Sequence, residues 1–402
     1  MRRGSLRPVQ SAPWHRALAT AAGCASAGVV VQLAGPVVPV QVALIGLGVG
    51  LIGASFLLAW AADAGEAVFS GGLVLASIAL VAVLPEFIIE VRFAYTQQAD
   101  LVTANLTGAT RLLLTGAVAL PLLVAFLARR KNQAALPFQL AAARRLELGI
   151  LLITSVFAIQ VVARGRLTVV DGIILVALYA LYARRVQGTP EEEPAVLGVP
   201  AGLLSLPRQY QRPVIAALTV LAAVVVLMVA NPFVDALLLT GASLGFDPYF
   251  LIQSVVPVAT EAPEFVVVAV LVANRRPAQG VALFLASSVS QWTLGMGALP
   301  LAYFAGGGET SMPLAGPGQL ELALTVALTL FAVAALAFLR PERVDAALAA
   351  TVLVVHFIYP TPFVRVVAAF VLFVFAIDLF IDRRRAVPSL IQALFRKVGT
   401  SR

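Results

Sequence analysis

Long apolar runs alternate with short polar connections along almost the whole chain. Twelve runs approach the length of a membrane-spanning helix, at about 17–34, 40–62, 68–95, 100–128, 146–164, 167–184, 213–231, 249–273, 277–305, 318–339, 344–359 and 362–381. An α-helix of about 20 apolar residues crosses the hydrocarbon core of a bilayer. Because two of the runs are short, the pattern predicts an all-α polytopic membrane protein with about 11–12 transmembrane helices.

The composition supports a membrane protein and suggests its orientation. Of the 402 residues, 60% are hydrophobic and only 12% are charged, which excludes an ordinary soluble domain. The net charge of +8 comes from basic residues that lie between the apolar runs, where they orient a membrane protein. With a cytoplasmic N-terminus, 23 of the 28 basic residues fall on the cytoplasmic side. We therefore expect the plasma membrane, with both termini in the cytoplasm.

Several function classes are excluded by what the chain lacks. It has neither a phosphate-cradling glycine loop nor a soluble domain for a nucleotide, so it is not an ATP-driven pump. A single cysteine, Cys24, and two distant histidines, His15 and His356, cannot assemble a cysteine or histidine metal site. We expect no enzyme activity, no resident cofactor and no nucleic-acid partner. The expected partners are the lipid bilayer, inorganic cations and protons.

The two halves of the chain repeat each other. Leu146-Glu147-Leu148 recurs as Leu320-Glu321-Leu322, and Val170-Asp171 recurs as Val344-Asp345, each 174 residues later. An odd number of predicted crossings separates equivalent positions, so we expect two inverted-topology repeats of about five helices each. The predicted organisation is a cytoplasmic N-terminus with an extra helix (1–39), a first repeat (40–186), a cytoplasmic linker (187–211), a second repeat (212–361) and a final helix with a basic tail (362–402).

A proline followed by a glutamate occurs inside one apolar run of each repeat. The motifs are Leu84-Pro85-Glu86-Phe87 and Ala262-Pro263-Glu264-Phe265, which lie 178 residues apart. A proline inside a helix removes a backbone hydrogen bond, and an intramembrane charge costs at least about 2.5 kcal/mol. Such groups at matching positions indicate an ion site near the membrane midplane. Two nearby carboxylates cannot both stay ionised unless a cation arrives, so cation and proton would compete for the same oxygens.

The residues around these motifs resemble the calcium/cation antiporter superfamily, which contains the sodium/calcium and proton/calcium exchangers. The family's repeat reads roughly Gly-Thr-Ser-x-Pro-Glu on one helix and Gly-Asn-x-x-Gly-Ser-Asn on the next. The second half of the chain has Ala259-Thr260-Glu261-Ala262-Pro263-Glu264, and its Ser287-Ser288-Val289-Ser290-Gln291 resembles the Ser-Ser-Thr-Gln variant of the proton/calcium branch. The first half keeps Pro85-Glu86, Asn105 and Gly108 but lacks the Thr-Ser and Ser-Asn pairs.

The resemblance implies a secondary-active antiporter that exchanges Ca²⁺ or Na⁺ against H⁺ or Na⁺ by alternating access. Glu86 and Glu264 would be the central cation (metal) ligands. The residues expected around them are Asn105, Thr260, Glu261, Ser288, Ser290 and Gln291. Their oxygens suit hard cations. The alternative is a transport-inactive scaffold or regulatory protein, which the missing hydroxyls and amide of the first repeat favour.

Two charged residues depart from the family's pattern and are candidates for charge compensation. Glu90 lies one helical turn after Glu86 and either joins the acidic site or pairs with Arg92 near the outer membrane surface. Arg111 lies about a third of the way into its apolar run. It either reaches the outer surface or pairs with Glu86 as a fixed cation.

Polar residues near the ends of runs are expected to be structural. Glu147, Glu321, Asp171 and Asp345 match between the repeats, and helix ends and water would satisfy them there. The segment 387–398 carries Leu390, Ile391, Leu394, Phe395 and Val398 on one helical face, which predicts an interfacial helix on the cytoplasmic leaflet.

Overall fold

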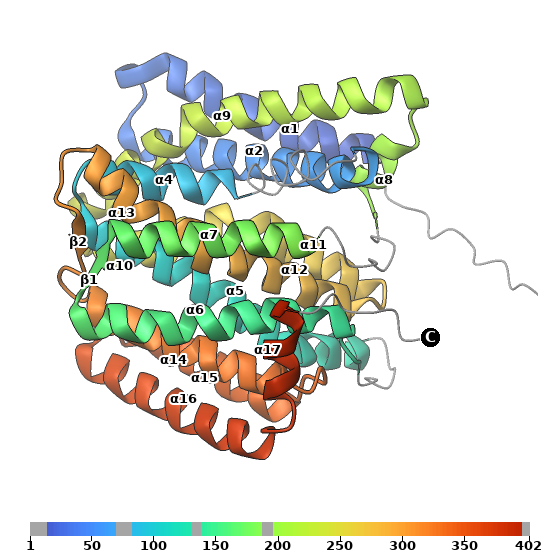
Figure 1. Cartoon of the computed structure of the whole chain (residues 1–402). Helices are drawn as coiled ribbons and strands as arrows, with labels where there is room; N and C mark the ends of the chain where they lie inside the picture. The colour runs from blue at the N-terminus through green and yellow to red at the C-terminus, as the bar shows by residue number, and fades with distance from the viewer. Residues whose placement is uncertain (1–13, 70–82, 131–137, 187–195, 396–402) are drawn as a thin grey trace, which may run out of the picture. The chain divides into compact units, whose positions relative to one another are not determined.

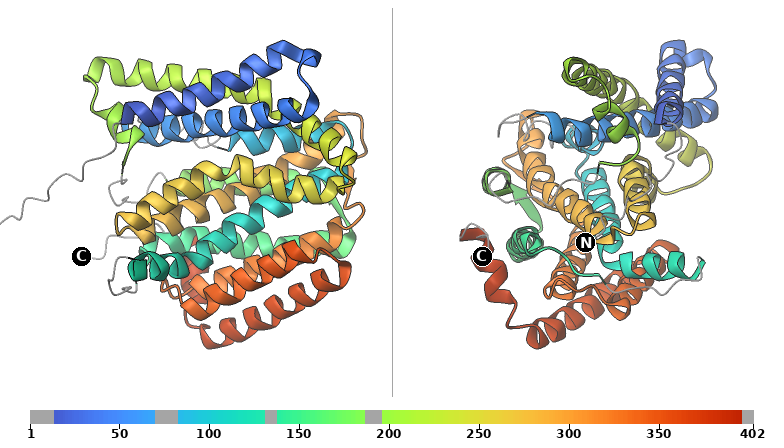
Figure 2. Two further views of the ribbon diagram at one scale, coloured as in Figure 1. Left: turned by 180° about the vertical axis from the view of Figure 1, so that it is seen from behind. Right: turned by 90° about the vertical axis from the view of Figure 1, so that its right-hand side faces the viewer.

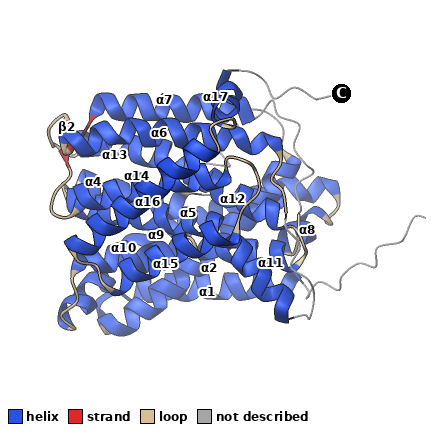
Figure 3. Cartoon of the chain, turned by 90° about the horizontal axis from the view of Figure 1, so that it is seen from below, coloured by secondary structure: helices blue, strands red, loops and turns tan. Residues whose placement is uncertain are grey.

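The structure, a computed structural model, describes residues 14–69, 83–130, 138–186 and 196–395. This part of the chain is helical apart from loops and two three-residue strands, β1 (Arg166–Thr168) and β2 (Ser311–Pro313) (Figures 1 and 3). The predicted all-α fold is therefore confirmed. The chain divides into two compact units, residues 1–85 with 193–236 and residues 86–192 with 237–402. Residues 187–195 of the predicted linker and the end of the basic tail lie outside the described residues.

The helices follow one another with short connections. The first half contains α1 (Trp14–Ala34), η1 (Gly35–Val37), α2 (Val40–Val68), α4 (Leu84–Tyr95), α5 (Ala99–Arg130), η2 (Ala142–Arg144), α6 (Arg145–Arg164) and α7 (Val169–Val186). The second half contains α8 (Val199–Leu204), α9 (Arg208–Ser243), α10 (Pro248–Thr260), α11 (Ala262–Ala273), α12 (Pro277–Ser290), the π-helical segment η3 (Gln291–Gly295), α13 (Met296–Ala305), α14 (Gly318–Leu336), α15 (Arg343–Ile358), α16 (Pro362–Asp382) and α17 (Val387–Phe395).

In the first unit, α1 packs along α2 through glycines. A side-chain carbon added at Gly28 would lie 2.6 Å from the Cα of Gly50, and one added at Gly53 would lie 2.6 Å from the carbonyl oxygen of Ala21. Small residues of this kind let two backbones approach closely, which is a common mode of helix association in membranes. The glycine-rich character of these runs therefore serves packing.

The second unit is built around α5 and α14. Helix α5 contacts α10, α12, α14 and α15, while α14 also contacts α6 and α16 (Figure 2). Almost every residue of α14 is buried. By contrast, α16 exposes large apolar side chains such as Phe363 and Phe370. An apolar exterior around a buried centre is what a lipid environment requires, since no water is available there to solvate polar groups.

Fewer helices pass a length and composition test for membrane crossing than the 11–12 expected. Among the described residues, eight helical stretches are long and apolar enough, and α10 with α11 forms a ninth, bent span. Helix α15 has only 16 residues, and α7 carries Asp171, Arg184 and Arg185. Part of the run predicted at 68–95 lies outside the described residues, and α4 covers only its end. The protein is an integral membrane protein with multiple spans.

The inversion of the repeats is visible within the second unit. Helix α6 ends directly before β1, whereas α14 begins shortly after β2, and β1 pairs antiparallel with β2 (Figure 1). The end of α6 therefore lies beside the start of α14, and the two helices pack together. Glu147 stands in the first turn of α6 and Glu321 in the first turn of α14, so these helices are equivalent in the repeats. Equivalent helices thus run in opposite directions.

The segment predicted as an interfacial helix forms α17, but half of its apolar face is covered by protein. Leu390 and Leu394 are buried and lie against Gly149 of α6, where an added side-chain carbon would meet the Leu390 carbonyl oxygen at 2.6 Å. Ile391 and Phe395 remain exposed. A helical pattern alone could not distinguish a lipid-facing surface from one that docks on a neighbouring helix.

Candidate cation site

Both proline–glutamate motifs stand at the beginning of a helix. Pro85 is the second residue of α4 and Pro263 the second residue of α11, so Glu86 and Glu264 lie in the first turns of their helices. Proline favours this position because its missing N–H is not needed there. A helix N-terminus carries a partial positive charge that stabilises a nearby carboxylate. From the sequence we expected both prolines to lie inside long helices. In the structure each lies at the start of a helix.

The second motif lies at a break in a membrane span. Helices α10 and α11 meet at Glu261 with a bend of 50°. Because Pro263 has no N–H, the carbonyl of Ala259 loses the donor that a continuous helix would supply. Broken helices with free carbonyls are tolerated at membrane depth when they line a protein interior, and they occur at the ion sites of transporters.

Four glutamates gather around this break. Glu86, Glu90 and Glu261 are each less than 5% exposed, and Glu264 is half-buried. Ionised carboxylates at Glu86, Glu90 and Glu264 would each repel a charge on Glu261. The structure therefore brings together the two predicted central ligands, the predicted Glu261 and Glu90. Of the two alternatives for Glu90, membership of the acidic site is the one observed.

Two predicted neighbours, Thr260 and Asn105, join this cluster. The hydroxyl of Thr260 lies within hydrogen-bonding distance of both the Glu86 carboxyl and the Val256 carbonyl, 3.1 Å away. When it donates to its own helix, its lone pairs can accept from a protonated carboxyl or ligate a cation. The amide nitrogen of Asn105 donates to Oε1 of Glu90 at 3.2 Å.

Helix α5 is held against α10 by a close backbone contact at Gly108. A side-chain carbon at this position would collide with the backbone carbonyl of Gln253. Beside this contact, Nε2 of Gln253 lies 3.3 Å from the hydroxyl of Thr107. The first-repeat glycine thus fixes the distance between Asn105 and the break in the opposite repeat.

The three predicted residues of α12 and η3 have different surroundings. Gln291 is hydrogen-bonded to Glu261 and so belongs to the acidic cluster. Ser288 and Ser290 donate to helix carbonyls, those of Phe284 and Ala286. Ser290 is also hydrogen-bonded to Tyr179 of α7. A role of these two serines as cation ligands stays a prediction.

Three glutamates of the acidic cluster, Glu86, Glu90 and Glu261, form no ion pair within the described part of the chain. Nor do three carboxylates, imidazoles or thiols of the described residues converge on one point that would hold a metal ion. The charge of these three acids can be neutralised by a proton or by a mobile cation.

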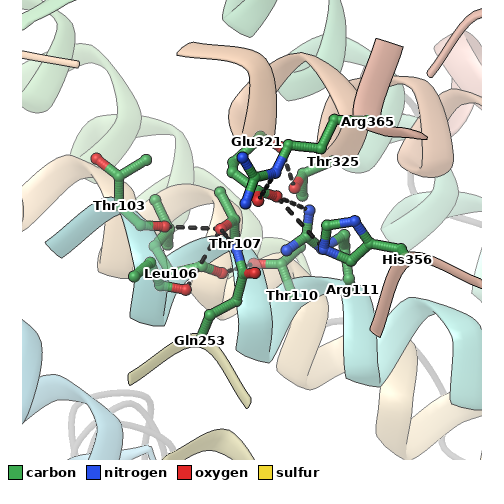
Figure 4. A network of polar contacts seen from close by, with 11 residues as sticks. Thr103, Leu106, Thr107, Thr110, Arg111, Gln253, Glu321, Thr325, His356 and Arg365 are labelled. Atoms are coloured by element: carbon green, nitrogen blue, oxygen red, sulfur yellow. Dashed lines mark hydrogen bonds and ion pairs between the residues drawn. The ribbon is translucent and has the colours of Figure 1, made fainter. Parts of the chain in front are cut away.

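Arg111 follows neither of the alternatives drawn from the sequence. It is 2% exposed, so it does not reach the membrane surface, and it pairs with Glu321 of α14 instead of Glu86 (Figure 4). Glu321 also pairs with Arg365 of α16, and His356 of α15 lies 3.7 Å from it. Arg111 therefore pairs with Glu321 and does not compensate the charge of Glu86.

This Arg111–Glu321–Arg365–His356 cluster was not found from the sequence. Glu321 was expected to meet water near a helix end, yet it is completely buried. Its partners Arg111 and Arg365 come from other helices, α5 and α16. The one available signal was the position of Arg111 within an apolar run, because a charge there needs a partner.

Comparison with known proteins gives a consistent picture. Residues 39–186 match the family model described as sodium/calcium exchanger protein. The solved structure of the H⁺/Ca²⁺ exchanger CAX is 28% identical, with a TM-score of 0.87, and the match covers 96% of this chain and 98% of that one. No curated protein matches the chain by sequence.

Two more distant structures share the fold. The Ca²⁺/H⁺ antiporter protein YfkE is 16% identical with a TM-score of 0.59, over 90% of this chain and 99% of its own. The sodium-calcium exchanger NCX_Mj is 16% identical with a TM-score of 0.54, over 80% of this chain and 98% of its own. At these identities the likeness concerns the fold alone.

Proposed function

We propose that this chain is a divergent member of the calcium/cation antiporter superfamily, a membrane cation antiporter, and that it exchanges Ca²⁺ for H⁺. Glu86 and Glu264 are the central ligands, with Glu261 beside them. The H⁺/Ca²⁺ exchanger CAX, similar over almost the full length, supports this choice of ions. The plasma membrane is the proposed location.

The observation that carries the proposal is the group of three buried acids, Glu86, Glu90 and Glu261, which form no ion pair within the described residues. A buried carboxylate without a counter-charge is costly, and each of these acids can be neutralised either by a proton or by a hard cation. Glu86, from the first repeat, and Glu261, from the second, both lie in it. Because protons and Ca²⁺ compete for these oxygens, the site binds one or the other. Exchange of the two ions requires this alternation.

The local structure indicates how the ionised and the protonated forms of these carboxyl groups are stabilised. The helix N-termini beneath Glu86 and Glu264 stabilise the carboxylates when they are ionised and bind the cation. The Thr260 hydroxyl can accept from Glu86 when this residue is protonated. Alternating access would expose the same oxygens first to one side of the membrane and then to the other.

The proposal is tested with the full chain reconstituted in liposomes that enclose a pH-sensitive dye. An inward Ca²⁺ gradient should drive protons outward, and a K⁺ gradient of the same ionic strength should not. A calcium flux that requires Na⁺ on the opposite side and moves no protons would replace Ca²⁺/H⁺ exchange by sodium/calcium exchange. If no gradient of Ca²⁺ or Na⁺ moves any ion through folded protein, the inactive-scaffold alternative holds instead.

A further inference from the structure

The buried charge cluster around Glu321 contains more positive than negative charge. Glu321 pairs with Arg111 of α5 and with Arg365 of α16 (Figure 4). Neither arginine pairs with a second acid among the described residues. The side chain of Glu321 is fully buried, and those of the two arginines are 3% and 9% exposed. Two guanidinium groups on one carboxylate leave one positive charge in excess, and protonation of His356, 3.7 Å from the carboxylate, would add another.

A small cavity adjoins this cluster between α5, α14, α15 and α16. Its polar lining consists of Arg111 and His356, and the rest of its wall is apolar, with residues such as Leu328, Ala349 and Leu372. Its volume is about 10 Å³, which is room for one particle of about the size of a water molecule. The cavity therefore suits a single small occupant that meets nitrogen donors on one side and hydrocarbon on the other.

One nitrogen atom on each of the two polar lining residues lacks a partner. Nη2 of Arg111 and Nδ1 of His356 form no hydrogen bond within the described residues, and both residues are 2% exposed. The imidazole of His356 lies beside Arg111 (Figure 4). A guanidinium group only donates, and an imidazole donates from Nδ1 when that atom carries the hydrogen. Because buried polar groups in proteins nearly always have a partner, these atoms indicate a bound acceptor.

We propose that this cavity binds one chloride ion, which accepts from Arg111 and His356. Two arginines would repel a cation, and a water molecule would accept a hydrogen bond but leave the excess charge uncompensated. A monovalent anion balances that charge. Chloride is little larger than water, so small shifts of the leucine side chains in the wall would admit it, whereas sulfate and phosphate are too large for the cavity.

The chloride ion would stabilise the second unit where four of its helices meet. Arg111, Glu321, His356 and Arg365 each come from a different helix, and a single carboxylate only partly offsets the repulsion between the two arginines. A bound anion removes the remaining positive charge and so favours the packed arrangement. This role is independent of which cations the protein exchanges, and its test needs no transport measurement.

Thermal unfolding of the purified full chain in a nonionic detergent tests the site. A ligand that binds only the folded state raises the unfolding temperature as it saturates. Sodium chloride should raise the midpoint of unfolding in a saturable manner, while sodium gluconate at the same ionic strength should not, because gluconate is too large for the cavity. Equal midpoints in the two salts across the titration would overturn the proposal and leave water as the occupant.

Two variants remove the site in different ways. Arg111→Met removes a donor together with the excess charge, since Arg365 still pairs with Glu321. Ala349→Val keeps every charge and fills the cavity, because Ala349 is part of its wall. In both variants the apparent affinity for chloride should fall by about tenfold or more, which corresponds to the loss of one charge-assisted hydrogen bond.

Arg144→Met is the matched control, because it removes an arginine from a different ion pair, that with Glu147, which lies outside the lining of the cavity. It should keep the chloride response of the unaltered protein. If Arg111→Met fails to fold, Ala349→Val alone decides the question. A chloride response that persists unchanged in the folded variants would show that chloride acts elsewhere on the protein and would refute this site.

Discussion

The four glutamates of the acidic cluster have three kinds of local environment. Glu86 and Glu264 use helix N-termini, Glu261 sits in the break between α10 and α11, and Glu90 accepts from Asn105. These acids therefore do not share one environment, although all lie close together. We expect them to differ in role, with the helix-terminal pair, Glu86 and Glu264, binding the divalent cation.

Gly108 is the residue whose size fixes the distance between the two repeats at the site. In Gly108→Ala, the added methyl meets the Gln253 backbone and cannot be relieved by a side-chain rotation. We expect a loss of stability of about 1–3 kcal/mol, typical of overpacking, measured as a lower midpoint of thermal unfolding. Gly23→Ala is the control, because nothing lies within 4 Å of the added carbon. Equal midpoints for both variants would contradict the close contact.

At the scale of elements, the Arg111–Glu321–Arg365–His356 cluster joins α5, α14, α16 and α15 by charge. Glu321 is its centre, because both arginines pair with it. Breaking a buried ion pair from one side costs about 3–5 kcal/mol, since a charge is left without a partner. Replacing a whole buried ionic group by apolar residues is often much less harmful.

This arrangement predicts an order of stabilities. Glu321→Leu leaves two buried arginines unpaired and should be the most destabilised, by about 3–5 kcal/mol. Arg111→Met should be milder, because Arg365 still pairs with Glu321. The triple variant with Glu321→Leu, Arg111→Met and Arg365→Met should recover much of the loss. Denaturant unfolding in detergent measures the order, and a triple variant less stable than Glu321→Leu would show that the pairs do not act as a unit.

The elements that could be predicted from the sequence are those with a local signal. The apolar runs predicted most of the helices. The matching motifs Pro85-Glu86 and Pro263-Glu264 predicted the residues at the centre of the candidate site. The partner of Arg111 could not be predicted, because Glu321 is 210 residues away and is equivalent in the repeats to Glu147, which pairs locally with Arg144. The π-helical segment η3 also has no signature in the sequence.

For the molecule as a whole, the pairing of β1 with β2 gives direct geometric support for inverted repeats. It puts the end of α6 beside the start of α14. The loop before β2 and the connection between α16 and α17 then lie at opposite ends of the second unit, as α17 packs near the start of α6 (Figure 1). Which end faces the cytoplasm follows from the distribution of basic residues and stays a prediction.

Cysteine labelling tests this orientation. In a Cys24→Ser background, Glu309→Cys and Arg385→Cys each place one exposed thiol at opposite ends of the second unit. A membrane-impermeant maleimide should label the cysteine at 309 in intact cells and the cysteine at 385 only after permeabilisation, because basic connections stay in the cytoplasm. The reverse pattern would invert the orientation, and labelling of both in intact cells would disprove the layout of the last helices.

The central claim is that protons and calcium compete for Glu86 and Glu264. Its most direct test is calcium-driven proton flux in liposomes for Glu86→Gln and Glu264→Gln, with Glu309→Gln in an exposed loop as the control. Glutamine keeps the size of the side chain but cannot titrate. Both site variants should fold and reach the bilayer, yet their flux should fall to that of protein-free liposomes, while the control retains full flux. Normal flux in both site variants under a saturating gradient would contradict the account.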